Sequence, residues 1–227
     1  MIRALLFDFD GLLVDTESPS FDAWADVYRQ HGHELTLDTW SAAIGTLDGF
    51  DPFADLEGRL GRPLDRDTVN ERRRELEFAA TDLEELRDGV AEYLREAEQL
   101  GLARAIVSSS GDSWINRHLE RLDLLEGWSC IVAANGDATV AKPLPTLYLA
   151  ALDRLGVAAD EAIAFEDSPN GITAAKAAGI YCVAVPNPTT ETLDVTHADL
   201  VLVSLEEVPL ADLIARVEAE QERTAAR

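Results

Sequence analysis

The sequence is poor in cysteine, in lysine and in long apolar runs, and each shortage excludes a class of protein. Two cysteines among 227 residues rule out a disulfide-built scaffold, and both Cys130 and Cys182 stand in apolar runs, where we expect buried, reduced thiols. No stretch approaches the roughly 18 apolar residues of a membrane span. The apolar run before Asp8 is too short for a signal peptide, so we expect a cytosolic protein.

Positive charge is scarce as well. Lys and Arg total 19 against 43 Asp and Glu, and the formal net charge is -24. A surface this acidic repels nucleic acid and anionic membranes, so neither is an expected partner, and we expect a monomer or a weak homodimer. The only two lysines are Lys142 and Lys176. This bias is equally typical of a halophile-like, high-salt cytoplasm and of a GC-rich genome, and composition does not separate the two.

The remaining composition is that of a globular protein. Hydrophobic residues make up 47% and charged residues 27% of the chain, which excludes extended disorder. Short apolar runs alternate with longer segments of helical period, the pattern of a parallel β-sheet with helical crossovers. The predicted strands are 2–7, 103–108, 129–133, 162–166, 181–185 and 199–203, and the predicted helices between them are 89–100, 112–122, 144–155 and 170–178.

One crossover is far too long for a single helix. Residues 17–85 lie between the first two predicted strands and carry apolar residues at helical spacing, with no strand pattern among them. We therefore predict an α/β fold with two parts. A doubly wound parallel sheet, formed by residues 1–16 and 86–227, carries an inserted all-helical cap domain, residues 17–85.

Polar side chains concentrate where the predicted strands end, which is the edge at which open α/β sheets bind ligands. The first strand runs into two carboxylates, Asp8 and Asp10, which lie on the same side of extended backbone. The second strand ends at Ser108 in a run of hydroxyl-bearing residues that opens a helix. Such a turn is a natural cradle for an anion.

Two further groups complete this set. Lys142 stands at the start of another predicted helix, and the strand 162–166 ends in Glu166 and Asp167. Carboxylates that converge on one point cannot all be ionised without a cation, and oxygen ligands favour a hard metal, of which Mg²⁺ is the best match. A lysine and hydroxyl and amide donors beside that metal can hold a phosphate. The sequence therefore predicts phosphoryl transfer.

In order and spacing, four segments resemble the four motifs of the haloacid dehalogenase-like hydrolase superfamily, whose core is Rossmann-like. Two carboxylates at a strand end are common by chance, but four ordered motifs across nearly the whole chain are a specific match. The chain is similar in particular to the subfamily with a helical cap after the first motif, which contains β-phosphoglucomutases and sugar-phosphate or phosphoglycolate phosphatases. The segments are Asp8-Phe9-Asp10-Gly11-Leu12-Leu13-Val14-Asp15-Thr16-Glu17, Ser108, Lys142-Pro143 and Glu166-Asp167-Ser168-Pro169-Asn170-Gly171.

The resemblance implies roles for the two aspartates of the first segment. Asp8 would attack phosphorus and form an aspartyl-phosphate, and its other oxygen would bind Mg²⁺. Asp10 would protonate the leaving oxygen and then deprotonate the hydrolytic water, with its backbone carbonyl on the metal. The dehalogenases of the family lack this second aspartate and need no metal. A small phosphorylated metabolite is therefore the expected substrate.

The other segments are implied to hold the phosphoryl group and the metal. Ser108 and the amide of Ser109 would bind phosphoryl oxygens, and Lys142 would offset the charge of the nucleophile. Asp167 would ligate Mg²⁺, with Glu166 as a ligand or directly behind the ligands. The implied metal set is thus Asp8, Asp10, Glu166 and Asp167.

A phosphatase and a phosphomutase both remain open within this resemblance. The β-phosphoglucomutases carry a histidine near the start of the first cap helix and basic cap residues that bind a second phosphate. Here residues 18–21 hold no histidine and the cap loop 45–50 holds no arginine, which favours a phosphatase. Arg72, Arg73 and Arg74 leave the mutase open, because one of three consecutive helical positions points toward the core. We expect at least two of them to pair with neighbouring glutamates.

A catalytically quiet binding protein is a third alternative. Such a descendant has no physical reason to keep adjacent buried carboxylates, because these cost stability. Other residues near the motifs are expected to be structural. Asp15 and Thr16 are interpreted as helix caps, Ser110 as the start of a helix, and the four tryptophans, Trp114 among them, as packing residues.

Overall fold

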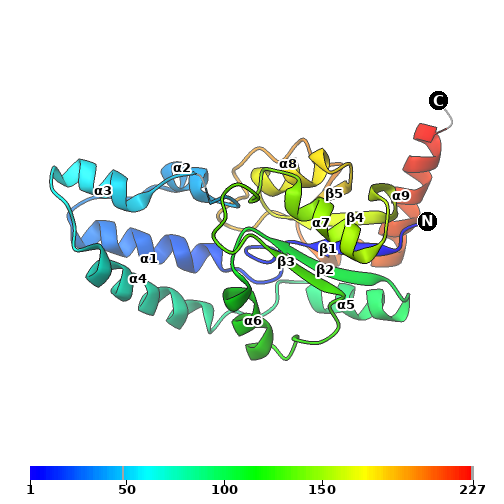
Figure 1. Cartoon of the computed structure of the whole chain (residues 1–227), viewed down its shortest axis with the longest axis horizontal. Coiled ribbons are helices and arrows are strands. Elements are labelled where there is room, and N and C mark those ends of the chain that lie inside the picture. Colours follow the sequence, from blue (N-terminus) through cyan, green and yellow to red (C-terminus); the bar gives the residue numbers. More distant parts are fainter. Residues whose placement is uncertain (48, 226–227) are drawn as a thin grey trace.

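The computed structural model describes residues 1–47 and 49–225, and its core elements follow the predicted order (Figure 1). Each predicted strand and core helix is present, with its ends within two residues of the prediction. The strands are β1 (Ala4–Phe7), β2 (Ala103–Ser108), β3 (Cys130–Ala133), β4 (Ala162–Glu166), β5 (Tyr181–Ala184) and β6 (Leu200–Val201). The helices are α1 (Glu17–Gln30), α2 (Leu37–Trp40), α3 (Pro52–Leu60), α4 (Arg66–Thr81), α5 (Val90–Gln99), α6 (Asp112–Arg121), α7 (Thr146–Leu155), α8 (Pro169–Ala177) and α9 (Leu210–Ala225), with short 3-10 turns at Ser41–Ala43, Ala159–Glu161 and Leu205–Glu207.

The strands form one parallel sheet in the order β3-β2-β1-β4-β5-β6. β1 lies between β2 and β4, with Phe7 opposite Ile106 on one side and Phe165 on the other. The chain moves outward from β1 first through β2 and β3 and then, on the other side, through β4, β5 and β6. This is the predicted doubly wound topology, and it brings the loops after β1, β2 and β4 together at one edge of the sheet.

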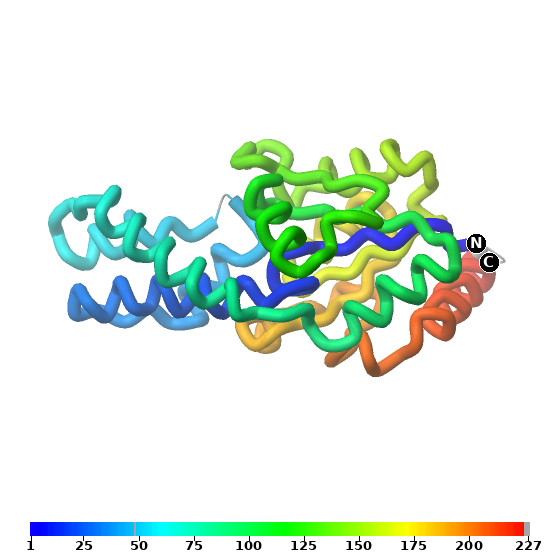
Figure 2. The backbone as a smooth tube through the Cα atoms, turned by 90° about the horizontal axis from the view of Figure 1, so that it is seen from below, coloured from blue at the N-terminus to red at the C-terminus, as the bar shows by residue number. Residues whose placement is uncertain are grey.

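Successive side chains of the central strands face opposite sides of the sheet and build two cores. Leu5 and Phe7 pack against α5, α6 and α9, whereas Ala4 and Leu6 pack against α7 and α8. Figure 2 shows the first of these faces, with α5 and α6 in front of the sheet. Helices therefore cover both faces, which explains why the strands are apolar at successive positions.

Helices α1 to α4 lie together at one end of the molecule, beyond the carboxyl ends of the strands (Figure 1). They enclose a core of their own, in which Trp24 meets Phe53 edge to face at 4.8 Å between centroids. Every regular element within residues 17–85 that the structure describes is helical, as expected of the cap. The bounds at 17 and 85 stay a prediction from the sequence.

The two cysteines differ in their surroundings. Cys182 on β5 is buried, as expected, but Cys130 is only half-buried. The expectation was wrong for Cys130 because β3 is an edge strand of the sheet, which the sequence pattern does not reveal. Among the described residues, no helix combines the length and the apolar character needed to cross a bilayer.

Candidate active site

The residues after β1 place two carboxylates at the centre of the sheet edge. Asp8 is buried, and its backbone amide donates to Phe165 O of β4 at 3.0 Å, which fixes Asp8 beside that strand. Gly11 then turns the chain with φ at +78°, and a side chain here would collide with Asp167 and Asn187. Glycine at this position therefore allows the backbone after Asp8 to approach the loop that follows β4.

Asp8, Glu166 and Asp167 form a buried carboxylate cluster, in which ligand oxygens of all three lie within 4.8 Å of one another. Burial, together with the neighbouring carboxylates, raises the pKa of Asp8 and of Asp167, so ionising the whole cluster requires a cation. Glu166 Oε2 is buried and has no hydrogen-bond partner among the described residues. The ligand atoms are all hard oxygens, so the cluster fits a divalent cation such as Mg²⁺.

Lys142 supplies part of the charge that this cluster needs. Its side chain is 1% exposed, and its ammonium contacts Asp8 and, at 2.7 Å, Glu166 Oε1. Burial acts to lower the pKa of this ammonium, but the two carboxylates outweigh burial and raise the pKa, so Lys142 stays charged. Lys142 lies in the turn before α7 and not in the helix itself, which begins at Thr146. Tyr148 of α7 donates its hydroxyl to Glu166.

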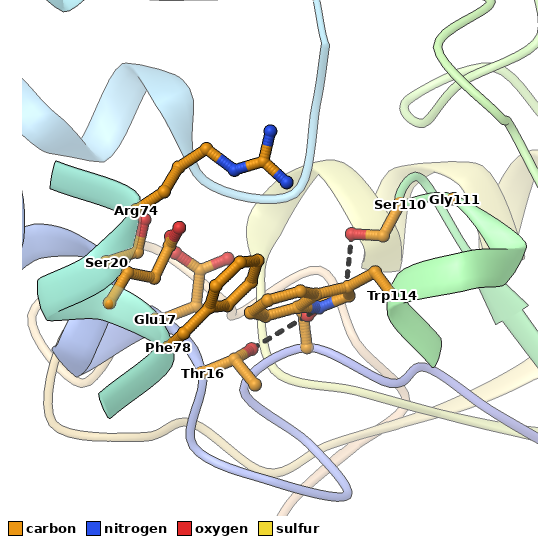
Figure 3. Close-up of a pocket in the computed structure, with 10 residues that line it drawn as sticks. Thr16, Glu17, Ser20, Arg74, Phe78, Ser110, Gly111 and Trp114 are labelled. Carbon is orange, nitrogen blue, oxygen red and sulfur yellow. Dashed lines mark hydrogen bonds between the residues drawn. The ribbon is translucent and has the colours of Figure 1, made fainter. Parts of the chain in front are cut away.

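The Asp10 carboxylate lies outside the cluster and accepts four hydrogen bonds. Its Oδ1 accepts from the Thr16 hydroxyl at 2.8 Å and from the Trp114 indole Nε1 at 2.7 Å. Its Oδ2 accepts from the Ser110 hydroxyl at 2.6 Å and from the Ser108 hydroxyl at 3.2 Å. Two of these contacts are drawn as dashed lines beside the labelled Thr16 and Ser110 in Figure 3. The carboxylate is therefore fully hydrogen-bonded before any substrate is bound.

Three of these donors were interpreted as structural from the sequence, and the structure corrects that interpretation. Thr16 occupies the N-cap position of α1, but its side chain makes no capping bond because its hydroxyl turns toward Asp10. Asp15 does act as a cap, since its Oδ1 accepts from Ser18 N at 3.0 Å. Ser110 and Trp114 contribute polar contacts to the site as well as structure.

The serines after β2 have separate environments. Ser108 is 1% exposed, and its Oγ accepts from Ser110 N at 3.0 Å. Ser109 Oγ accepts from Lys142 N at 3.2 Å, which ties the loop after β2 to the segment before α7. The structure thus brings together Asp8, Asp10, Ser108, Ser109, Lys142, Glu166 and Asp167, the residues singled out from the sequence.

Two core side chains hold the cap loop through its backbone. Ser109 Oγ donates to Gly45 O at 3.1 Å, and Asn170 Nδ2 donates to Ile44 O at 2.8 Å. This is the loop whose sequence holds no arginine, and its aspartate, Asp48, lies outside the described residues. The loop therefore closes over the core site at a fixed place.

Two adjoining hollows share Asp10, Glu17 and Ser110 in their walls. The smaller has a volume of about 80 Å³ and is lined by Asp8, Ser108, Ser109 and Lys142 of the core and by Ala43, Gly45, Thr46 and Leu47 of the cap. The larger has a volume of about 290 Å³ and is completed by Thr16, Ser20, Arg74, Glu77, Phe78, Gly111 and Trp114. Figure 3 shows the larger hollow, with the cap residues facing Ser110 and Trp114 across it.

One of the three consecutive arginines on α4 reaches the site. Arg72 pairs with Glu75 at 3.4 Å and Arg73 with Glu77 at 2.8 Å, so the expected pairing with glutamates holds for these two. Arg74 lines the larger hollow, where Figure 3 shows its guanidinium extending from α4. No carboxylate of the described residues pairs with Arg74.

Two polar residues of the site were not assigned from the sequence. Glu17, the first residue of α1, lines both hollows, and burial together with the Asp10 charge raises its pKa to about 8. Asn187, after β5, is 2% exposed and donates to Asp167 Oδ2 at 2.7 Å. Glu17 stood at the end of the first motif and could have been singled out, whereas no pattern around Asn187 marks it.

Comparison with known proteins gives one consistent family. The sequence model of the haloacid dehalogenase-like hydrolases matches residues 2–179. A Bacillus subtilis (strain 168) protein, provisionally named phosphatase YhcW, is 42% identical over 214 residues, which are 94% of this chain and 97% of that protein. The validoxylamine A 7'-phosphate phosphatase of Streptomyces hygroscopicus subsp. limoneus is 30% identical over 211 residues, or 92% of this chain and 96% of that protein.

A solved structure agrees with the sequence matches. A variant of CbbY from Rhodobacter sphaeroides, in complex with xylulose-1,5-bisphosphate, superposes with a TM-score of 0.74 at 27% identity and covers 94% of this chain and 99% of that chain. The family match includes every residue of the carboxylate cluster and Lys142. The chain therefore belongs to the haloacid dehalogenase-like hydrolases.

Proposed function

We propose that the chain is a Mg²⁺-dependent phosphatase that hydrolyses a small phosphorylated metabolite, a sugar phosphate first of all, through an aspartyl-phosphate on Asp8. The observation that carries this proposal is the position of Asp8, which contacts Lys142 inside the buried cluster and also lines the smaller hollow. A nucleophile is thereby placed between a cation and the space for a substrate. The names of the two sequence relatives, both phosphatases, support the same reaction.

The smaller hollow suits the phosphoryl group. It holds little more than one compact polar group. The donors on its walls are the hydroxyl of Ser109, the backbone N–H groups that follow Ser108 and the ammonium of Lys142. The larger hollow then takes the organic part of the substrate. Bound in this way, the ester oxygen lies near Asp10, which lines both spaces. The xylulose-1,5-bisphosphate bound to CbbY supports a sugar phosphate as the occupant.

In the first step, a carboxylate oxygen of Asp8 forms a bond to phosphorus while the bond from phosphorus to the leaving oxygen breaks. Asp10 gives its proton to that oxygen, so the product leaves as an alcohol. In the second step, Asp10 takes a proton from water, whose oxygen attacks phosphorus and releases Asp8 and inorganic phosphate. Lys142 offsets the negative charge beside Asp8 in both steps.

Asp8, Glu166 and Asp167, with the backbone carbonyl of Asp10, would hold Mg²⁺. The metal, when bound, supplies the positive charge that lets these carboxylates ionise together and neutralises phosphoryl oxygens. Asn187 orients Asp167 toward this role, because its amide donates to Oδ2 of that carboxylate.

Phosphate release tests the proposal. Sugar phosphates, phosphoglycolate and nucleoside monophosphates are supplied with Mg²⁺ or with EDTA, at low and molar KCl. We expect release that needs Mg²⁺ and falls to background in Asp8→Asn. Asp153→Asn, which removes an exposed carboxylate on α7, is the matched control and keeps full activity. No release by the folded wild type under any condition contradicts the proposal and favours the binding protein.

The metal is tested separately by heat unfolding. Mg²⁺ is expected to raise the melting temperature of the wild type, because it binds the folded cluster and not the unfolded chain. Asp167→Asn is expected to lose most of this rise, and Asp153→Asn to keep it. Equal Mg²⁺ effects on all three proteins contradict a metal at the cluster.

A phosphomutase is the second candidate, and Arg74 is the observation that favours it. This guanidinium lies over the Phe78 ring, forms no ion pair among the described residues, and lines the larger hollow, where a second phosphate of a bisphosphate would lie. A mutase shares the first step and returns the phosphoryl group to a sugar instead of to water. Isomerised sugar phosphate whose formation depends on a bisphosphate activator would establish this alternative.

A further inference from the structure

Trp114, near the start of α6, joins the Asp10 carboxylate to the cap. Its indole Nε1 donates to Asp10 Oδ1 at 2.7 Å. Its ring stacks on Phe78 of α4, with centroids 5.6 Å apart and planes inclined by 29°. Figure 3 shows the two rings lying against each other where cap and core meet. One side chain of the core therefore touches both a cap helix and the carboxylate proposed to transfer the proton.

The two oxygens of Asp10 are held by different parts of the molecule. Oδ1 accepts from Thr16, directly before α1, and from Trp114, which rests on α4. Both donors to Oδ1 are thus connected to the cap. Oδ2 accepts from Ser108, the last residue of β2, and from Ser110 in the core loop that follows.

The donors also differ in chemistry. A hydroxyl can rotate and either donate or accept, so Thr16 and the two serines adapt when Asp10 gains a proton. An indole N–H only donates. The oxygen that faces Trp114 therefore has to remain an acceptor, whereas Oδ2 can be protonated once a serine hydroxyl turns to accept.

We propose that Trp114 is a positioning residue: its N–H keeps Oδ1 of Asp10 as the acceptor, so Oδ2 carries the proton for the leaving group. Because Phe78 of α4 stacks on Trp114, the position of α4 affects which oxygen of Asp10 is protonated. The inference rests on the proposed function, in which Asp10 is the general acid. In the step itself, the bond between the proton and Oδ2 breaks and a bond to the leaving oxygen forms. The carboxylate that results regains its hydrogen bonds from both serines.

Trp114→Phe tests the N–H alone, because phenylalanine keeps a ring against Phe78. The substrates are phenyl phosphate and p-nitrophenyl phosphate, which are similar in shape, while the nitrophenolate leaves with little need of a proton. We expect kcat/KM, which reports the steps up to departure of the leaving group, to fall about 10- to 100-fold for phenyl phosphate, as for the loss of a hydrogen bond to a charged group, and less than about threefold for p-nitrophenyl phosphate.

Trp128→Phe is the matched control. It also removes one indole N–H, which donates to the backbone oxygen of Leu124 at 2.8 Å away from the hollows, so both substrates should be turned over as by the wild type. An equal loss of kcat/KM on both substrates in Trp114→Phe assigns Trp114 a merely structural role and overturns the inference. An unchanged kcat/KM on both substrates overturns it as well.

The link to α4 is tested with Phe78→Leu, which removes the stacked ring and keeps the indole. We expect the same selective loss on phenyl phosphate, smaller than in Trp114→Phe. In the double variant, Phe78→Leu should add no further selective loss, because its effect passes through Trp114. Full additivity shows that Phe78 acts by another route and overturns the link.

The two proposals fail in different ways. Phosphate release by the wild type that disappears in Asp8→Asn establishes the proposed function without reference to Trp114. If Trp114→Phe then shows no selective loss, the inference alone is overturned. If the folded wild type releases no phosphate from any ester, the inference falls together with the proposed function.

Discussion

The two hollows of the candidate site are built in opposite ways. The smaller one is lined by buried side chains, among them Ser108 at the end of β2 and Lys142 in the turn before α7, each 1% exposed. Much of the wall of the larger one comes from cap helices, and Arg74 there is exposed. Pairing of β1 and β2 with strands on both sides fixes Asp8 and Ser108, and Ser109 holds the backbone of Lys142, whereas packing between helices holds the second set. The comparison separates a rigid place for chemistry from an adaptable place for recognition.

The largest effect is expected from removing the buried lysine that lines the smaller hollow. Lys142→Met leaves the carboxylates beside Asp8 without their cation. The free energy of unfolding without Mg²⁺ should fall by about 3–5 kcal/mol, as for a broken buried ion pair. Activity should fall by about 10³-fold, because the charge beside the nucleophile is lost. Urea unfolding and phosphate release measure the two effects.

Lys176→Met is the control for this change. Its ammonium pairs with Asp199 at 2.5 Å but is 36% exposed, so its loss should cost less than about 1 kcal/mol and leave activity intact. Similar losses in both variants would mean that the buried position of Lys142 has no special importance.

A smaller effect is expected from changing the wall of the larger hollow. Arg74→Gln should raise KM about tenfold for substrates with a second anionic group and leave KM for neutral sugar phosphates unchanged, because only the former meet the guanidinium. The free energy of unfolding should fall by less than about 1 kcal/mol, since Arg74 has no ion pair to lose among the described residues and only its exposed contact with the Phe78 ring is lost. Arg72→Gln is the control, because Arg72 is already paired with Glu75. A fall in kcat on all substrates would place Arg74 in the chemistry instead.

Glu17 lines both hollows, so a change at this residue affects the smaller and the larger one together. Its pKa in the folded protein, about 8, exceeds the ordinary 4.5. Between these values the folded protein still binds a proton that the unfolded chain has released, so the wild type loses stability as pH rises from 4.5 to 8. Glu17→Gln removes this loss. Its melting temperature should exceed that of the wild type by a few degrees at pH 9 and equal it near pH 4.5, and equal values at both pH would contradict the burial of this carboxyl.

The smallest change is expected from added salt, which screens the exposed acidic surface more than it screens the buried site. KCl should raise the melting temperature up to about 0.2 M, because it screens repulsion within a chain of net charge -24. It should change kcat little, since the buried cluster is poorly screened. A further steep rise into the molar range would assign the acidity to a high-salt cytoplasm, and a flat profile there would assign it to genome composition.

The sequence predicted the sheet and its edge because both depend on strands. Asp8, Ser108 and Glu166 each stand at the end of an apolar run, and parallel strands must bring their ends together. The direction of a single side chain is set by its neighbours in space and leaves no such pattern. Thr16 has the sequence of a helix cap and Trp114 that of a packing residue, yet both bond to Asp10.

The attachment of the cap loop has a consequence for how this protein can change. Ser109 and Asn170 hold the loop by the carbonyl oxygens of Gly45 and Ile44, which every amino acid possesses. The anchorage therefore does not depend on the neighbouring side chain of Leu47, which is 44% exposed and lines the smaller hollow. Randomising position 47 in a library should diversify the substrates accepted, while the loop keeps its hydrogen bonds to the core.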